Sequence, residues 1–185
     1  DPTGLTNALA AGAKSRGATF MMNTRVTGIT VSNNEVKEVV TDKGVIKTDV
    51  VIDAAGLWGN DIANMVGITL PLIPMAHLYL ITKPIKDQPQ KMPTMRDPDN
   101  LVYYRGTASG MIAGGYEHEP KPWGLNGVPQ DWNFKLLEPD WDRFTPLMES
   151  IIKRVPSMET AEIVQLLNGP EGFTPDSEYL LGPTS

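Results

Sequence analysis

The sequence contains no cysteine and only two histidines among its 185 residues. The absence of cysteine excludes disulfide bonds and thiolate metal sites, and two histidines are too few for most metal centres built from imidazole. No uninterrupted apolar run approaches the roughly 20 residues that a membrane-spanning helix needs. Basic residues are also scarce, with 16 Lys and Arg against 22 Asp and Glu. The net charge of -6 therefore argues against nucleic acid and anionic membranes as partners.

The chain begins at Asp1 and Pro2, with no initiator methionine, signal-peptide pattern or Arg-rich transit segment. We therefore expect an internal piece of a longer protein. With 41% hydrophobic and 21% charged residues, the composition is typical of a soluble globular protein that has enough chain for one sizeable core or two small ones.

The first 70 residues show the pattern of a helix, a meander and a buried strand. Asp1 and Pro2 suit the N-cap and the first helical position, and Gly17 closes the helix. Residues 50–56 form a nearly continuous apolar run, as expected of a strand that is covered on both faces, and a short helix follows over 61–66. The strands of the meander are predicted at 18–22, 26–31, 35–41 and 45–47.

After residue 70 the chain changes to strands that are separated by proline and glycine. A long Pro-, Gly- and Trp-rich connection over 117–139 precedes a predicted helix over 141–153. We place a domain boundary near residues 68–72, and the fold class is mixed α/β with α+β character. The strands of this part are predicted at 77–82, 101–105 and 111–116.

Six short motifs, taken in order and spacing, carry a resemblance to a known family. They resemble the D-amino-acid-oxidase-like FAD-dependent oxidoreductases, and within these the branch of sarcosine and dimethylglycine dehydrogenases. The resemblance covers essentially the whole chain. The motifs are Asp1-Pro2-Thr3-Gly4-Leu5, Asn23-Thr24-Arg25-Val26-Thr27-Gly28-Ile29, Ala54-Ala55-Gly56-Leu57-Trp58, His77-Leu78-Tyr79-Leu80-Ile81-Thr82, Tyr103-Tyr104-Arg105 and Gly169-Pro170-Glu171-Gly172-Phe173-Thr174-Pro175-Asp176.

The resemblance implies three parts of a flavoprotein. Residues 1–70 would belong to a dinucleotide-type FAD-binding domain, residues 71–165 to an antiparallel-sheet domain that roofs the substrate pocket, and residues 166–185 to a return into the FAD-binding domain. It also implies that the backbone of Val26 contacts the adenine end of FAD and that Trp58 contacts the cofactor. The alternatives are a strand core residue for Val26 and a packing tryptophan at a helix start for Trp58.

The Gly-x-Gly-x-x-Gly motif that holds a dinucleotide pyrophosphate does not occur in the sequence. We therefore expect this piece alone to hold FAD poorly and to be inactive. The resemblance allows a tetrahydrofolate-binding domain farther along the parent chain. Nothing in the sequence identifies the electron acceptor.

The resemblance places the chemistry on His77 and Tyr103. Residue alternation puts each side chain on one face of its strand, so both can face the flavin if the two strands lie side by side. A histidine that titrates near neutrality suits removal of a proton from a substrate amine, and a tyrosine hydroxyl can orient the same amine. The alternative for His77 is a structural histidine on a half-buried strand.

Four other polar residues have weaker claims. Arg105 or Lys83 could pair with a substrate carboxylate, although a solvated surface charge is the commoner state of either. Asp53 fits a hydrogen-bonded structural carboxyl better than a catalyst. The run 169–176 is turn-forming throughout and is expected to return the chain to the flavin domain, with no acid or base role for Asp176.

The function that the resemblance implies is FAD-dependent oxidative demethylation of a small N-methylated amino acid, by hydride transfer from the N-methyl carbon to the flavin. One alternative is a non-catalytic regulatory relative that resembles the regulatory subunit of pyruvate dehydrogenase phosphatase. A second is an interaction fragment without activity. A bacterial parent would imply the cytoplasm, and a eukaryotic parent the mitochondrial matrix.

Overall fold

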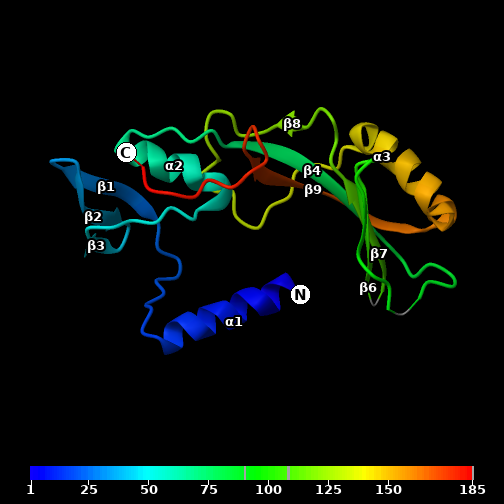
Figure 1. Ribbon diagram of the computed structural model, residues 1–185, viewed down its shortest axis with the longest axis horizontal. Helices are drawn as coiled ribbons and strands as arrows, with labels where there is room; N and C mark the ends of the chain where they lie inside the picture. The colour runs from blue at the N-terminus through cyan, green and yellow to red at the C-terminus, as the bar shows by residue number, and fades with distance from the viewer. Residues whose placement is uncertain (90, 108, 185) are drawn as a thin grey trace. The chain divides into compact units, whose positions relative to one another are not determined.

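The computed structural model describes residues 1–89, 91–107 and 109–184, which form two compact units. The first unit comprises residues 1–53 and 65–67, and the second comprises residues 54–64 and the chain from residue 68 onward. Figure 1 shows the order of the elements along the chain. The division at residues 70 and 165 that the sequence suggests stays a prediction.

The first unit contains helix α1 (Pro2–Ser15) and a three-stranded antiparallel meander. Asp1 caps the helix as predicted, since its carboxylate accepts a hydrogen bond of 3.1 Å from the backbone N–H of Gly4. Asn33 makes the first tight turn of the meander at a positive φ of 54°. The strands β1 (Val26–Ser32), β2 (Glu35–Thr41) and β3 (Gly44–Lys47) confirm three of the four that we predicted.

Two predicted strands are absent from the described part of the chain. Residues 18–22 form no strand, and neither do residues 50–56, where Val50 is 67% exposed and Ile52 is 85% exposed. A strand persists only where a neighbouring strand accepts and donates its backbone hydrogen bonds, and no described strand pairs with either segment. An apolar run by itself was therefore insufficient evidence for a strand.

The second unit is built on one sheet whose strands follow the order β5-β6-β7-β4-β8, with β9 paired to β4. Strand β4 is central, because β9 pairs with it along its whole length while β7 and β8 pair with successive stretches of it. All of these pairings are antiparallel, as predicted for this part. The strands are β4 (Ile73–Thr82), β5 (Met95–Asp97), β6 (Val102–Thr107), β7 (Gly110–Gly115), β8 (Lys121–Pro122) and β9 (Ile163–Phe173).

Strand β9 corrects the prediction that residues 169–176 are turn-forming throughout. The strand runs on to Phe173, and the turn begins only at Thr174. Gly169 and Pro170 suggested a turn, but β9 pairs with β4 alone among the described strands. A proline is tolerated on such an edge strand, because its missing N–H faces away from the ladder.

The core of the second unit lies between one face of the sheet and helix α3 (Trp141–Arg154). Leu78 and Leu80 from β4 and Tyr104 from β6 are fully buried there, together with Phe144 and Ile151 from the helix. The helix predicted over 141–153 is confirmed, and its apolar stripe lies on the sheet. The 3-10 turn η3 (Pro156–Thr160) adds the buried Met158.

A short helical segment precedes the sheet and confirms the helix predicted near residues 61–66. It consists of η1 (Gly56–Trp58), α2 (Gly59–Ala63) and η2 (Asn64–Val66). The Asn60 side chain fixes α2 to the segment before β4, since it donates to the carbonyls of Leu70 and Leu72. Within the described ranges, no helix has the length and apolar character to cross a bilayer.

Candidate active site

The two faces of the second sheet differ in what covers them. On β4, Leu78 and Leu80 point into the core, whereas His77, Tyr79 and Ile81 alternate onto the opposite face and are half-buried. We call this opposite face, which carries His77, the aromatic face. The predicted alternation of His77, Tyr79 and Ile81 on one face is therefore correct.

Tyr103 lies on the aromatic face and reaches His77. Its neighbour Tyr104 is fully buried in the core, so the two adjacent tyrosines point to opposite sides of β6. The Tyr103 hydroxyl lies 3.0 Å from Nε2 of His77, within hydrogen-bond distance. The structure thus brings together the two residues to which the sequence assigned chemistry.

The two strands do not lie side by side, which corrects one premise of the prediction. Strand β7 lies between β4 and β6, and its Gly114 is the cross-strand partner of both Tyr79 and Tyr103. A Cβ at Gly114 would lie 2.5 Å from the Tyr103 hydroxyl oxygen and 2.7 Å from Cβ of Tyr79. The missing side chain of this glycine lets Tyr103 cross β7 to His77.

Three residues of this site escaped the sequence analysis. Tyr116 follows β7, and its ring centroid lies 4.7 Å from that of His77 and 6.0 Å from that of Tyr103. The Phe173 ring meets the Tyr116 ring edge-on, with their centroids 6.4 Å apart. Glu171 on β9 is the cross-strand partner of Met75 on β4, which shares the face of His77. The position of Tyr116 could have been predicted from the alternation of side chains along β7, continued one residue past Gly115.

The surroundings of both side chains, His77 and Tyr103, favour their uncharged forms. Burial lowers the pKa of His77, and the carboxylates of Glu171 and Glu117 oppose this effect. Burial also raises the pKa of Tyr103 far above its usual range, helped by Tyr116. The Tyr103 hydroxyl donates to Nε2 of His77 when this nitrogen carries no proton, and it accepts a hydrogen bond from Nε2 when the nitrogen is protonated.

A cleft of about 440 Å³ begins at Tyr116 and extends to helix α3. In its wall, Arg143 donates a hydrogen bond of 2.7 Å to Glu117, and both side chains are largely buried. His118, the second histidine of the chain, lines the same cleft. The cleft therefore adjoins the His77 site through Tyr116.

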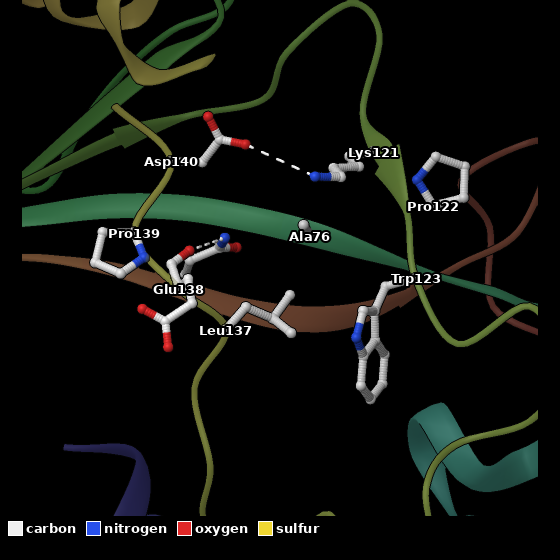
Figure 2. A pocket seen from close by; sticks show the side chains of 9 residues that line it. Ala76, Lys121, Pro122, Trp123, Leu137, Glu138, Pro139 and Asp140 are labelled. Atoms are coloured by element: carbon white, nitrogen blue, oxygen red, sulfur yellow. Dashed lines mark hydrogen bonds and ion pairs between the residues drawn. The ribbon is translucent and has the colours of Figure 1, made fainter. Parts of the chain in front are cut away.

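A second cavity, of about 240 Å³, lies on the other side of the sheet and is drawn in Figure 2. Ala76 points into it, and this buried residue alternates with His77 on β4. The carboxylate of Asp140 and the ammonium group of Lys121 face each other at 4.0 Å in its wall. The His77 site does not extend into this cavity.

The other polar residues that the sequence singled out have no hydrogen bond or ion pair to His77 or Tyr103 among the described contacts. Lys83 forms an ion pair of 2.5 Å with Glu162. Arg105 lies on the aromatic face, two residues from Tyr103, and is exposed. Asp53 is exposed in a segment without regular structure, and Asp176 accepts a hydrogen bond from a nearby backbone N–H in the final turn.

The two residues with predicted cofactor contacts lie in different units. Val26 is half-buried at the start of β1, whose second edge has no described partner strand. Trp58 ends η1 in the second unit, and its side chain is 36% exposed. Among the described residues, no group of three His, Asp or Glu side chains could hold a metal ion.

The family model described as FAD dependent oxidoreductase matches residues 1–185 of the chain. The chain belongs to this family of FAD-dependent oxidoreductases. The fold class predicted from the sequence, a mixture of helices and antiparallel sheet, is confirmed. The solved structure of L-proline dehydrogenase from P. horikoshii matches with a TM-score of 0.81 and 30% identity, over 100% of this chain and 47% of that one.

Among curated proteins, the chain is similar to both dehydrogenases and a regulatory subunit. It is 38% identical to the mitochondrial sarcosine dehydrogenase of Mus musculus, over 98% of this chain and 20% of that protein. It is 33% identical to the mitochondrial dimethylglycine dehydrogenase of Homo sapiens, over 99% of this chain and 22% of that protein. It is 36% identical to the mitochondrial pyruvate dehydrogenase phosphatase regulatory subunit of Mus musculus, over 95% of this chain and 20% of that protein. The chain thus spans about a fifth of the length of these relatives.

Proposed function

We propose that this chain forms part of an enzyme that oxidises the N-methyl group of a small N-methylated amino acid, with FAD as cofactor. The observation that carries the proposal is the hydrogen-bond distance of 3.0 Å between His77 Nε2 and the Tyr103 hydroxyl on a half-buried aromatic face. The similarity to sarcosine and dimethylglycine dehydrogenases supports the substrate class.

The pair is suited to remove a proton from an amine. A secondary or tertiary amine is a cation at neutral pH and must lose its proton before its nitrogen lone pair can assist the oxidation. Tyr103 takes this proton on its oxygen while its own hydroxyl proton passes to Nε2 of His77. The amine nitrogen becomes neutral, and the charge is held on the imidazolium.

The aromatic face is suited to hold a methylated ammonium group before deprotonation. The rings of Tyr103, Tyr116 and Phe173 stand close together there. Aromatic rings attract cations through their electron-rich faces, and they solvate methyl groups better than water does. The carboxylate of Glu171 adds a negative charge on the same side of the sheet.

Some of the residues present fit FAD. Val26 lies on a strand edge whose backbone groups are open to a hydrogen-bonding ring, and Trp58 offers a half-exposed indole to a flat apolar group. We assign Val26 and Trp58 to cofactor binding. When bound, FAD would accept the hydride from the substrate carbon, while His77 and Tyr103 hold the amine and its proton.

The similarity to a regulatory subunit favours a second candidate, which is a non-catalytic role. The two candidates differ in whether the His77–Tyr103 pair acts on a substrate. Conversion of Tyr103 to Phe removes one hydroxyl from this pair, and conversion of Tyr104 to Phe removes a hydroxyl from the core at the next position.

The test compares Tyr103→Phe with Tyr104→Phe in the protein expressed from the complete open reading frame and loaded with FAD. We expect Tyr103→Phe to slow anaerobic flavin reduction by sarcosine or dimethylglycine by about tenfold or more, with unchanged FAD content. Tyr104→Phe should reduce its flavin at the wild-type rate. A wild-type protein that binds FAD but is reduced by no methylated amino acid would favour the regulatory role instead.

A further inference from the structure

The side chain of Arg96, on the edge strand β5, lies next to the candidate active site. Arg96 on β5 is the cross-strand partner of Tyr103 on β6, and cross-strand partners share a face. Its side chain therefore rises from the aromatic face, beside the tyrosine that reaches His77. The sequence analysis did not single out Arg96, because three-residue β5 was not predicted.

The Arg96 side chain lies over the ring of Tyr116. Its guanidinium carbon lies 5.5 Å from the centroid of the Tyr116 ring, and this ring lies 4.7 Å from that of His77. Contact with an aromatic ring holds a guanidinium group in place and leaves its N–H groups free at the edges of its plane. Arg96, Tyr116 and His77 are thus consecutive neighbours on one face.

The guanidinium of Arg96 has no protein counter-ion within the described part of the chain. No described carboxylate lies within 4.0 Å of it, whereas Arg143 is bound to Glu117 at 2.7 Å and Arg154 to Asp97 at 3.1 Å. A guanidinium group presents a planar fork of N–H donors that matches a carboxylate. Arg96 is therefore available to an anionic group of a ligand.

A negative charge lies on the opposite side of the pair. Glu171 on β9 is the cross-strand partner of Met75, which shares the face of His77, and its charge is felt at both His77 and Tyr103. Positive charge thus flanks the pair on the β5 side and negative charge on the β9 side. Such a field orients a zwitterion that lies across the sheet.

We propose that Arg96 binds the carboxylate of the substrate and so fixes which end of a zwitterionic amino acid lies at His77 and Tyr103. This inference rests on the proposed function and adds a residue that determines specificity. The ammonium end then lies toward Glu171 and the aromatic rings. An amine without a carboxylate lacks this anchor and binds in no fixed direction.

Arg105 provides the matched control. It is exposed on the same face, two residues along β6 from Tyr103, and its positive charge also acts on that hydroxyl. Its cross-strand partner is Ile112, which lies two residues before Gly114 on β7. Arg105 is therefore a second cation on the aromatic face, without the position of Arg96 over Tyr116.

The test measures binding of two probes to the FAD-loaded protein from the complete open reading frame, by isothermal titration calorimetry. Trimethylglycine carries a carboxylate, and choline carries a hydroxymethyl group in its place. Both are quaternary ammonium ions without a nitrogen lone pair, so neither is oxidised during the titration. Binding is therefore read independently of turnover, and a failure of the proposed catalytic role would leave this result interpretable.

We expect Arg96→Gln to weaken trimethylglycine binding by roughly 10- to 100-fold, the usual effect of losing a hydrogen bond to a charged group. Choline binding should change less than about twofold, and Arg105→Gln should affect neither probe. Arg96→Lys should restore part of the affinity, because it retains the charge but not the planar fork. Equal losses for both probes in Arg96→Gln, a loss confined to Arg105→Gln, or no binding of trimethylglycine by the wild type would each overturn the proposal.

Discussion

The ring of Tyr103 crosses strand β7 directly over Gly114, on its way from β6 to His77 on β4. A Cβ at Gly114 would lie within 2.7 Å of two atoms of the Tyr103 phenol group. The hydrogen bond between His77 and Tyr103 therefore depends on a residue that has no side chain. The His77–Tyr103 pair is assembled from three strands rather than two.

Replacement of Gly114 by Ala should separate Tyr103 from His77. We expect anaerobic flavin reduction to slow at least as much as in Tyr103→Phe, and the double variant should be no slower than Gly114→Ala alone, because the two changes remove the same interaction. Gly169→Ala is the control, since Gly169 is the cross-strand partner of His77 on β9 and a Cβ there would meet only Leu136, at 3.9 Å. A wild-type reduction rate in Gly114→Ala would show that Tyr103 does not act through this contact.

The ionisation of His77 should follow its burial and its acidic neighbours. Because burial lowers its pKa, we expect the imidazole resonances of His77 to titrate below the usual value of about 6.5, and Glu171→Gln should lower this pKa further by removing a carboxylate that raises it. The unfolded chain then binds more protons than the folded one below pH 6.5, so this residue's contribution to stability is present above that pH and is lost as the pH falls. A rise in the His77 pKa in Glu171→Gln, measured by NMR, would contradict the assignment.

The core between the sheet and α3 should account for much of the stability of the second unit. Phe144 is fully buried, and its replacement by Ala is expected to lower the free energy of unfolding by about 3–5 kcal/mol. Trp141 meets the Phe144 ring edge-on at 6.3 Å but is 47% exposed, so Trp141→Ala should cost clearly less. Chemical denaturation of both variants measures the difference, and equal losses would show that α3 is not packed as described.

Trp58 should affect cofactor retention more than stability. Its indole is 36% exposed and belongs to no buried cluster, so Trp58→Ala should leave the unfolding midpoint nearly unchanged. We expect the variant to lose FAD during gel filtration more readily than the wild type, as judged by flavin absorbance per protein. Trp141→Ala serves as the control for loss of an exposed tryptophan elsewhere. If both variants retain FAD equally well, the assignment of Trp58 to the cofactor is wrong.

Much of the fold followed from local sequence patterns. Alternation along each strand placed His77 and Tyr79 on one face, and it directed the adjacent Tyr103 and Tyr104 to opposite faces. The pairing of strands was harder, because local patterns carry no information on which strand is adjacent to which. For this reason β7 was not expected between β4 and β6, and residues 50–56 were taken for a strand.

The composition of the site was predictable only in part. Arg96 lies over Tyr116, and the Tyr116 ring contacts His77, through cross-strand register and ring packing that become visible only once the strands are aligned. Glu171 was hidden in a segment rich in Gly and Pro, whose strand forms because β4 offers it a complete ladder of partners. Residues that act through tertiary neighbours were therefore missed, while those on long alternating strands were found.

The central claim is that His77 serves as the base for a methylated amine. The most direct measurement is the rate of anaerobic flavin reduction by sarcosine or dimethylglycine in His77→Ala, with His118→Ala as the control, in the FAD-loaded protein from the complete open reading frame. His118 is the second histidine of the chain and lines the adjoining cleft. We predict a loss of about 10²–10⁴-fold for His77→Ala with an altered pH profile, and a wild-type rate for His118→Ala. Reduction of the His77→Ala flavin at the wild-type rate across the pH range would contradict the account.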